Sequence, residues 1–229
     1  MRILLIRHGE SLGNVDKAVH ACLPDHAIPL SKRGVAQSQQ AGMFLADFFR
    51  SAGVSPETPV RLWTSPYNRT RQTAGAIVEE MAGFNIDTRE HINLCEQQFG
   101  LFDGVPDEEL FNRFPDEYAH YAKCEEYEGR FWARMPLGES RFDVAVRVHQ
   151  AFGTFHRDAD KHGINNIVVI CHGVVLRAFV MQWLHLTPEW FDAEPNPGNC
   201  WVRLIEDGID SGYIFQPTWK GGPVSEDIT

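Results

Sequence analysis

Short apolar runs that stop abruptly at polar residues set the pattern of this chain. The clearest are residues 3–6, Ile-Leu-Leu-Ile, and residues 166–170, Asn-Ile-Val-Val-Ile. Residues 60–64 and a stretch within 86–95 are similar. Runs of this kind are typical of strands that are buried on both faces of a parallel sheet. We expect a last strand at residues 200–205, at an edge of the sheet.

Helical periodicity fills the intervals between these strands. Ser31 is a suitable N-cap, and Ser140 with Asp143 resembles a capping box. We expect helices at 31–52, 66–81, 140–162 and 174–184, and a short one from Thr187. Residues 15–29 are expected to be irregular and the tail from Trp219 to be frayed. The alternation predicts an α/β fold of three layers, a mainly parallel sheet flanked by helices on both faces.

Residues 103–138 interrupt the alternation and are rich in acidic and aromatic residues. We interpret them as a helical, cap-like insertion that forms a pocket wall within a single domain spanning residues 1–229. The alternative is an ordinary pair of surface helices. Arg113, Arg130 and Arg134 are candidate substrate contacts unless neighbouring acidic residues pair with them.

Composition excludes several classes of function. The formal net charge is −10, which argues against general binding to nucleic acid or anionic membranes. The number of cysteines is odd and no C-x-x-C pair occurs, so a disulfide framework is not expected and a reducing compartment fits. The apolar run at the start is too short for a signal peptide or a membrane span. We therefore expect a soluble, cytoplasmic protein.

The first strand ends in groups that can hold a phosphoryl group. Arg7 supplies a fixed cation, His8 a nucleophile or base, and Gly9 room for close approach. Ser11 and Asn14 add small polar groups. Ligands of open α/β sheets bind outside the carboxyl ends of the strands. The same sequence of apolar strand, histidine, glycine and helix occurs a second time later in the chain.

That second turn is His172-Gly173, after the strand at 166–170. We expect Arg69, in the turn and helix after the strand at 60–64, and Glu96, at the end of the strand within 86–95, to lie at the same edge. Arg71 is expected to point elsewhere, because it lies two residues beyond Arg69 on a helix. The remaining histidines are interpreted as surface or structural residues: His20, His26, His91, His120, His149, His156, His162 and His185.

These motifs resemble the histidine phosphatase superfamily, in its phosphoglycerate-mutase-like branch. The resemblance runs in order over nearly the whole chain. It rests on Arg7-His-Gly-Glu-Ser11 with Asn14, Ser65-Pro-Tyr-Asn-Arg69 followed by Gln72-Thr73-Ala74, Glu96 with Phe99-Gly100, and His172-Gly173.

The resemblance implies a metal-independent enzyme that uses no cofactor. It implies that His8 attacks phosphorus and becomes a phosphohistidine, and that Glu96 donates a proton to the leaving oxygen. Arg7, Arg69 and His172 would surround the phosphoryl oxygens. The implied substrate-binding residues are Gly9, Ser11, Asn14 and Gly173.

Three other readings remain open. Cys171 and Arg177 have the C-x5-R spacing of cysteine-dependent phosphatases, although the residues between them are largely apolar. A metal hydrolase could use His8, His172 and Glu96, although no ligand spacing of that kind is present. The third reading is a non-catalytic module that binds phosphoproteins.

Within the family the question is whether the enzyme is a phosphatase or a mutase. Mutases of this branch typically place Arg and Tyr directly after the catalytic Glu, whereas this chain has Gln97, Gln98 and Phe99. The stretch from Phe114 to Ser140 is loosely similar to the fructose-2,6-bisphosphatase members. We therefore expect a phosphatase that acts on a small phosphorylated metabolite, with a mutase or a phosphoprotein phosphatase as alternatives. A homodimer is left open.

Overall fold

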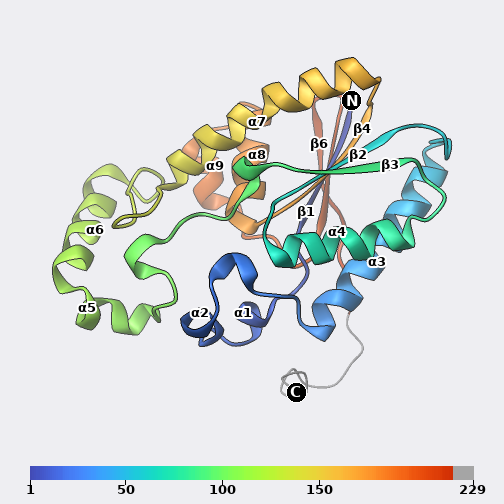
Figure 1. The fold of residues 1–229 in the computed structure, drawn as a ribbon. Helices are drawn as coiled ribbons and strands as arrows, with labels where there is room; N and C mark the ends of the chain where they lie inside the picture. Colours follow the sequence, from blue (N-terminus) through green and yellow to red (C-terminus); the bar gives the residue numbers. More distant parts are fainter. Residues whose placement is uncertain (219–229) are drawn as a thin grey trace.

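A six-stranded sheet forms the centre of the protein, seen in a computed structural model that describes residues 1–218 (Figure 1). The strand order is β3-β2-β4-β1-β5-β6. Strands β1 to β4 run parallel to one another, and β5 and β6 are antiparallel additions. The strands are β1 (Arg2–Arg7), β2 (Val60–Thr64), β3 (Ile86–Glu90), β4 (Asn166–Cys171), β5 (Val202–Glu206) and β6 (Ile209–Phe215).

Helices cover both faces of this sheet, which confirms the predicted three-layer α/β fold. Alternate residues of β1 enter two separate cores. Leu4 and Ile6 face α3 (Lys32–Ser51) and α4 (Asn68–Glu80). Ile3 and Leu5 face the second helical layer. That layer consists of α7 (Arg141–His162), α8 (Gly173–Trp183) and α9 (Pro188–Ala193).

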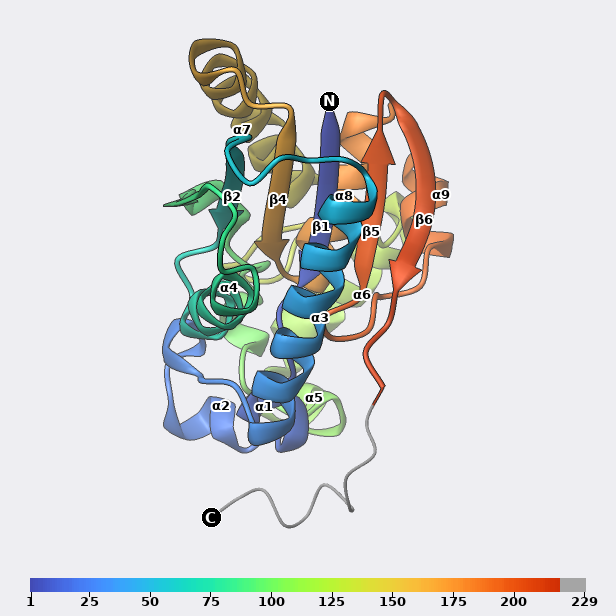
Figure 2. The same cartoon turned by 90° about the vertical axis from the view of Figure 1, so that its right-hand side faces the viewer.

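The remaining short elements gather at the end of the sheet toward which β1 and β4 run (Figure 2). Two of them, α1 (Leu12–Val15) and α2 (Val19–Cys22), follow β1 directly. Within 103–138 the chain forms α5 (Leu110–Arg113) and α6 (Pro115–Glu128). Single 3-10 turns occur at Asp25–Ala27, Ile92–Leu94, Gly100–Phe102 and Asp107–Glu109.

Two helix starts follow the predicted capping chemistry. The Ser31 hydroxyl accepts from the backbone N–H of Gly34 at the start of α3. Ser140 and Asp143 form the reciprocal capping box at the start of α7. Each cap satisfies backbone donors that a helix terminus leaves unpaired.

Three expectations about local structure were wrong. The strand at 200–205 is not at the edge, because Asp207 and Gly208 take positive φ values of 50° and 80° and turn the chain into the edge strand β6. The strand within 86–95 ends at Glu90, so Glu96 lies beyond it in a loop. Residues 15–29 contain helical turns rather than only irregular structure.

No helix in residues 1–218 combines the length and apolar character needed to cross a membrane. The predicted frayed tail from Trp219 lies outside the described residues.

Candidate functional site

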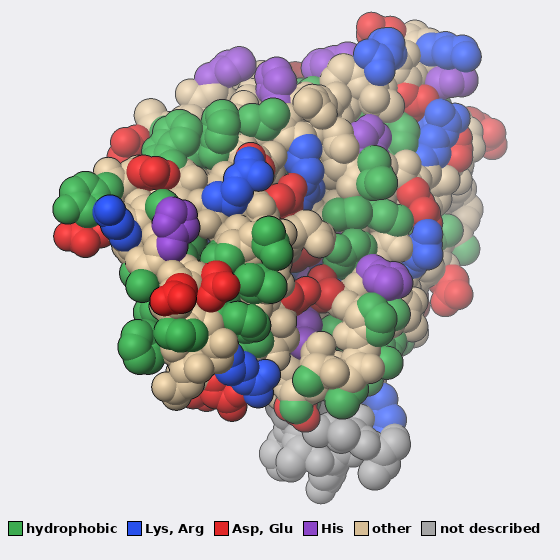
Figure 3. Space-filling model, turned by 60° about the vertical axis from the view of Figure 1, so that its left-hand side comes forward, with side chains coloured by type: hydrophobic (Ala, Val, Ile, Leu, Met, Phe, Trp, Pro, Cys, Tyr) green, Lys and Arg blue, Asp and Glu red, His purple; other side chains and the backbone are tan. Residues whose placement is uncertain are grey.

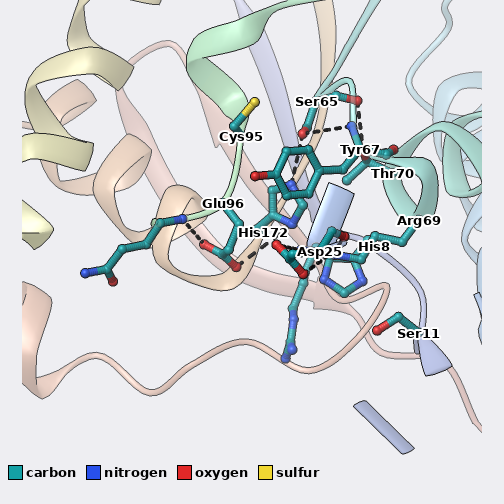
Figure 4. A network of polar contacts seen from close by, with 12 residues as sticks. His8, Ser11, Asp25, Ser65, Tyr67, Arg69, Thr70, Cys95, Glu96 and His172 are labelled. Atoms are coloured by element: carbon teal, nitrogen blue, oxygen red, sulfur yellow. Dashed lines mark hydrogen bonds and ion pairs between the residues drawn. The ribbon is translucent and has the colours of Figure 1, made fainter. Parts of the chain in front are cut away.

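A cavity of about 120 Å³ lies at the carboxyl ends of the parallel strands, and most of the predicted site residues line it. Most of the lining side chains are polar, and they come from the end of β1 and the segment after it, from the start of α4 and from the segment after β3. Figure 4 shows His8, Arg69, Asp25, Glu96 and His172 in one group. The lining residues are Arg7, His8, Ser11, Asn14, His20, Asp25, Arg69, Glu96, Phe99 and Asp103.

His8 is buried directly after β1. Its Nδ1 lies 2.7 Å from the carbonyl oxygen of Gly9. Burial lowers the pKa of the His8 imidazole well below its ordinary value of 6.5, and the charges of Arg7 and Arg69 lower it further. The ring is therefore neutral, with Nε2 left for other chemistry.

His172 occupies the equivalent place after β4, as the N-cap residue of α8. Its ring lies 5.2 Å from that of His8, measured between centroids. The Nε2 atom is 2.9 Å from the hydroxyl of Ser65, whereas Nδ1 has no hydrogen-bond partner and lies 3.9 Å from Glu96 Oε2. Burial, followed by the charge of Arg69, lowers the pKa of His172 well below its ordinary value. The Ser65 contact was not predicted, although Ser65 ends the expected strand at 60–64.

Glu96 reaches the cavity from the loop after β3. One carboxyl oxygen accepts the backbone N–H of Gln97 at 2.9 Å. Burial raises the pKa of the Glu96 carboxyl, against the opposing effects of this hydrogen bond and of Arg69 and Arg7. A carboxyl group with a raised pKa can hold a proton at pH values where an ordinary glutamate cannot.

The two predicted arginines differ in their partners. Arg7 donates to the carbonyl oxygen of Pro197 at 2.7 Å. Arg69 forms a two-pronged ion pair with Asp25, at 2.9 and 3.1 Å, and also donates to the Asp25 carbonyl oxygen at 2.6 Å. Asp25 was missed in the sequence because it lies in a stretch without periodicity. His20, interpreted as a surface or structural residue, instead lines the cavity, with Nδ1 3.6 Å from Asp25 Oδ1.

Ser11 and Asn14 form a capping box at the start of α1. The Ser11 hydroxyl accepts the Asn14 N–H at 3.2 Å, and Asn14 Oδ1 accepts the Ser11 N–H at 3.1 Å. Asn199 Nδ2 donates to Asn14 Oδ1 at 3.2 Å and to the carbonyl oxygen of His8 at 3.0 Å. Asn14 lines the cavity, and its side-chain amide nitrogen makes no hydrogen bond to a described residue.

The two predicted glycines lie behind the site rather than among its lining residues. The N–H of Gly9 donates to Thr73 Oγ1 at 3.0 Å, and a Cβ at Gly9 would lie 2.4 Å from the carbonyl oxygen of Gly34. A Cβ at Gly173 would lie 2.2 Å from Asn196 Oδ1. Gly9 requires glycine because the neighbouring atom belongs to the backbone, whereas a side chain at Gly173 would have to displace the side chain of Asn196.

The cysteine alternative lacks the electrostatics that it needs. Cys171 is fully buried in β4, and burial raises the pKa of its thiol. A thiolate nucleophile requires the opposite shift.

Among the described residues, no three or more His, Cys, Asp or Glu side chains are grouped so as to hold a metal ion.

Several other candidate cations are occupied by acidic partners. As predicted, Arg71 points elsewhere and pairs with Glu90. Within or beside the insertion, Arg113 pairs with Glu109 and Arg134 with Asp143. Arg130 lies 3.5 Å from Glu125 through its Nε, and it also lines a pocket.

Two larger spaces adjoin the central cavity. We call the first the arginine lobe: it has a volume of about 410 Å³ and is lined by Glu96, Phe99, Arg130, Arg141 and Arg177, together with Gln97, Met135, Val174 and Asn196. The second, of about 450 Å³, has mixed polarity and is lined by Gly13, Asn14, Lys17, His20, Phe99, Phe102, Asp103, Gly104, Val105, Pro106 and Asn196. Figure 3 shows acidic and histidine side chains in a hollow of the surface on this side of the molecule.

Comparison with known proteins decides the family. Residues 3–211 match the histidine phosphatase superfamily (branch 1). The chain belongs to this family. The resemblance inferred from the strand-end motifs is thereby confirmed.

Curated relatives include both mutase-like proteins and phosphatases. The chain is 36% identical over 220 residues to phosphoglycerate mutase-like protein AT74 of Arabidopsis thaliana, covering 93% of this chain and 66% of that protein. It is 35% identical to the related AT74H, covering 93% of this chain and 76% of that protein. It is 25% identical to the broad-range acid phosphatase DET1 of Saccharomyces cerevisiae, covering 95% and 90% of the two chains.

Solved structures show the same fold. A mycobacterial glucosyl-3-phosphoglycerate phosphatase aligns with a TM-score of 0.67 at 21% identity, covering 90% of both chains. A putative alpha-ribazole-5'-P phosphatase from Escherichia coli aligns with a TM-score of 0.69 at 20% identity, covering 97% and 99%. The family match and the curated relatives identify the protein as an enzyme of the phosphatase and phosphoglycerate-mutase-like type, and the solved structures show that it has the same fold.

Proposed function

We propose that the chain is a phosphomonoester hydrolase in which His8 forms a phosphohistidine. The observation that carries the proposal is the 2.7 Å contact between His8 Nδ1 and the carbonyl oxygen of Gly9. A carbonyl oxygen only accepts hydrogen bonds, so Nδ1 holds the ring proton and Nε2 holds a lone pair. The pKa of His8, lowered by burial and by two arginines, keeps that lone pair available.

In the first step, Nε2 of His8 attacks phosphorus as the bond to the leaving oxygen breaks. Glu96 in its carboxylic acid form, which the raised pKa favours, gives its proton to that oxygen. Arg7 and Arg69 line the cavity in which charge develops on the phosphoryl oxygens. When the Ser65 hydroxyl donates to Nε2 of His172, the ring proton of His172 is on Nδ1. This N–H group is then an uncharged hydrogen-bond donor beside Glu96.

In the second step, water attacks the phosphohistidine and the bond between nitrogen and phosphorus breaks. The Glu96 carboxylate accepts a proton from that water, so inorganic phosphate leaves and both residues return to their starting states. A mutase would use a hydroxyl of the returning substrate in place of water. Gln97 and Gln98 stand where mutases typically have Arg and Tyr. Their side-chain amides donate to the Glu139 carbonyl oxygen and the Tyr67 hydroxyl, so they do not supply the charge that would hold a returning substrate, which supports hydrolysis.

We further propose that the leaving group is a small metabolite that carries a second anionic group. Glu96 lines both the phosphoryl cavity and the arginine lobe, so a leaving oxygen beside Glu96 directs the rest of the substrate into that lobe. Residues 103–138 would form the pocket wall, since Arg130 and Met135 line the lobe.

The charges in the arginine lobe support an anionic ligand. Arg177 is 8% exposed, its Nε has no hydrogen-bond partner, and its Nη1 reaches only the carbonyl oxygens of Phe191 and Glu194. Arg141 pairs with Asp192 and Arg130 with Glu125, so Arg177 is the arginine of the lobe without an ion pair among the described residues. Burial lowers the pKa of Arg177, and the charge of Arg141 lowers it further. A carboxylate or a second phosphate would offset this excess of positive charge.

The proposed compartment is the cytoplasm, in keeping with five free cysteines. The homodimer is also a proposal, and light scattering of the purified chain measures it directly.

Trapping the intermediate tests the proposed chemistry. Wild-type enzyme mixed with phosphorus-labelled p-nitrophenyl phosphate and quenched in alkali should carry label that is acid-labile and alkali-stable, as a phosphohistidine is. His8→Ala should carry none, and Glu96→Gln should carry more, because water attack lacks its base. If the wild-type enzyme hydrolyses the substrate but carries no label after the quench, the proposal is refuted. Addition of 2,3-bisphosphoglycerate and 3-phosphoglycerate in parallel would reveal mutase activity.

A substrate pair tests the arginine lobe. Phosphoglycerate and glycerol phosphate differ in one carboxylate and present similar leaving oxygens. Arg177→Gln should raise KM for phosphoglycerate by about tenfold, the value of one lost charge-assisted contact. KM for glycerol phosphate should stay within about twofold. Equal effects on the two substrates would place the second group elsewhere.

A further inference from the structure

Arg147, on α7, uses all of its donors on two groups of acceptors. Nη1 donates to the carbonyl oxygens of Asn93 at 2.8 Å and Cys95 at 2.7 Å. Nη2 donates to the carbonyl oxygen of Glu96 at 3.0 Å and to Glu139 Oε2 at 2.9 Å. Nε donates to Glu139 Oε1 at 2.7 Å. A guanidinium has five N–H groups, so none is left for another partner.

The segment that Arg147 holds is also held by its own 3-10 turn at Ile92–Leu94, by the buried side chain of Leu94 and by Gln98 Nε2, which donates to the Glu96 carbonyl oxygen at 3.4 Å. It follows the end of β3 at Glu90 and is not part of a strand. Glu139 completes its attachment: Oε2 accepts the N–H of Gln98 at 3.0 Å, and the backbone N–H of Glu139 donates to the Gln98 carbonyl oxygen at 2.8 Å. Residues on both sides of Glu96 are therefore tied to one ion pair, Arg147–Glu139.

A single peptide group connects this ion pair to the Glu96 carboxyl. Arg147 binds the carbonyl oxygen of Glu96, and the N–H of the same peptide group, that of Gln97, donates to Glu96 Oε1 at 2.9 Å. A peptide group is planar, so its oxygen and its N–H turn together. When Arg147 fixes the carbonyl, it also fixes the donor that orients the carboxyl.

We propose that Arg147 and Glu139 are positioning residues that aim the Glu96 carboxyl at the leaving oxygen. This inference rests on the proposed function, in which Glu96 is the proton donor. Neither residue lines the phosphoryl cavity or the arginine lobe. Their hydrogen bonds therefore reach the reaction through Glu96, and their effect should grow with the need of the leaving oxygen for a proton. The charge of Arg147 also lowers the pKa of His172, so a variant at Arg147 has to keep that charge.

Leaving groups of different basicity separate this role from a merely structural one. An alkyl phosphate such as glycerol phosphate needs proton donation, whereas p-nitrophenolate departs readily without it. Arg147→Lys keeps the charge but cannot supply five donors in a fork. We expect kcat/KM for glycerol phosphate to fall about a hundredfold, and for p-nitrophenyl phosphate less than about fivefold, since general acid catalysis contributes roughly 10²–10⁴-fold.

Matched variants control for folding. Arg157→Lys changes an exposed arginine on the same helix, which donates only to Thr154, and should leave both rates unchanged. If Arg147→Lys fails to fold, Glu139→Gln serves as the second variant, because glutamine keeps one acceptor but not the ion pair. The same comparison of kcat/KM for glycerol phosphate with kcat/KM for p-nitrophenyl phosphate then decides. Equal losses on both substrates, or no loss on either, would overturn the positioning role.

Phosphohistidine trapping distinguishes the two ways to fail. If wild-type enzyme forms the labelled intermediate but the Arg147→Lys and Glu139→Gln variants leave the substrate ratio unchanged, the positioning role is wrong and the proposed function stands. If wild-type enzyme turns over without any labelled intermediate, the proposed function itself is wrong.

Discussion

The imidazole rings of His8 and His172 meet edge to face, with their centroids 5.2 Å apart, although the two residues lie far apart along the chain. They meet because β1 and β4 are neighbouring parallel strands in which Arg7 is paired with Cys171. Each histidine is therefore the first residue beyond its strand, at the same level of the sheet. Each ring also has one nitrogen held in place, by Gly9 and by Ser65.

The Ser65 hydroxyl should control the ring of His172. Ser65→Ala would leave a buried Nε2 without its partner, a loss of about 1–3 kcal/mol that a rotated or protonated ring could relieve. We expect kcat for p-nitrophenyl phosphate to fall by about tenfold or more, with KM nearly unchanged. Ser38→Ala removes another buried hydroxyl, one that donates to Gly34, and should leave kcat unaltered. Similar kcat values for the two variants would argue against this role of Ser65.

The dependence of kcat on pH should report His8 and Glu96. Protonation of His8 removes the nucleophile, and its lowered pKa places this acidic limb below pH 6.5. Loss of the Glu96 proton removes the acid, and its raised pKa places this alkaline limb above pH 4.5. With an alkyl phosphate, Glu96→Gln should lower kcat by roughly 10²–10⁴-fold and abolish the alkaline limb.

Glu90→Gln is the matched control, because Glu90 pairs with Arg71 on the surface. It should retain both limbs and the wild-type maximum. An alkaline limb that persists unchanged in Glu96→Gln would assign that limb to another group.

Local patterns were sufficient to predict the strands that carry the site. The β-branched run at 166–170 and the apolar run at 3–6 both form central strands, which need no specific partner to be recognised in sequence. Ser31 and Ser140 marked helix starts for the same reason, since a cap is satisfied by residues three positions away. The edge strand β6 was missed because Ile209–Phe215 mixes apolar residues with Asp210, Ser211 and Gly212 and contains no fully buried residue.

The parts of the site that were missed depend on contacts between distant segments. Asp25 meets Arg69 only because the loop after β1 folds over the start of α4. Arg147 meets the Glu96 loop only because α7 packs beside the 3-10 turn before it. Neither contact leaves a periodic signal in the sequence. Glu96 was predicted correctly although the strand boundary was wrong. The prediction rested on the motif of Glu96 with Phe99-Gly100, and not on the position of Glu96 at the end of a strand.

A buried ion-pair network at the opposite end of the sheet should contribute stability but not activity. Arg61 is 2% exposed and binds Asp158 through Nε at 2.5 Å, and it also pairs with Asp87. Arg61→Met would leave Asp158 buried with only Arg89 and His162 beside it. Removing one partner of a buried pair costs about 3–5 kcal/mol of folding stability. Because Arg89 and His162 remain beside Asp158, we expect the free energy of unfolding to fall by about 3 kcal/mol.

Urea unfolding measures this loss. Arg71→Met breaks a pair whose side chains are 53% and 44% exposed, and should cost less than about 1 kcal/mol. Activity per folded molecule should be unchanged in Arg61→Met, because Arg61 lies near the start of β2, away from the cavity. Equal stability losses in the two variants would contradict the assignment.

Asp25 should weaken the binding of phosphate. Its carboxylate holds Arg69 in the geometry that a phosphate would use, and it lines the same cavity. A bound phosphate dianion would therefore lie beside a fixed negative charge, which costs several kcal/mol at contact distance and less after solvent screening. We expect Asp25→Asn to lower the inhibition constant of inorganic phosphate at pH 7.5 by roughly tenfold.

Asparagine keeps a carbonyl oxygen for Arg69, so this variant tests the charge more than the contact. The tighter binding should diminish toward acidic pH, because phosphate then becomes a monoanion and is repelled less. Asp16→Asn, which changes an exposed carboxylate outside the lining of the cavity, should have no effect. If Asp25→Asn instead weakens phosphate binding at both pH values, the carboxylate serves to orient Arg69 for the substrate, and its repulsion of phosphate is the smaller effect.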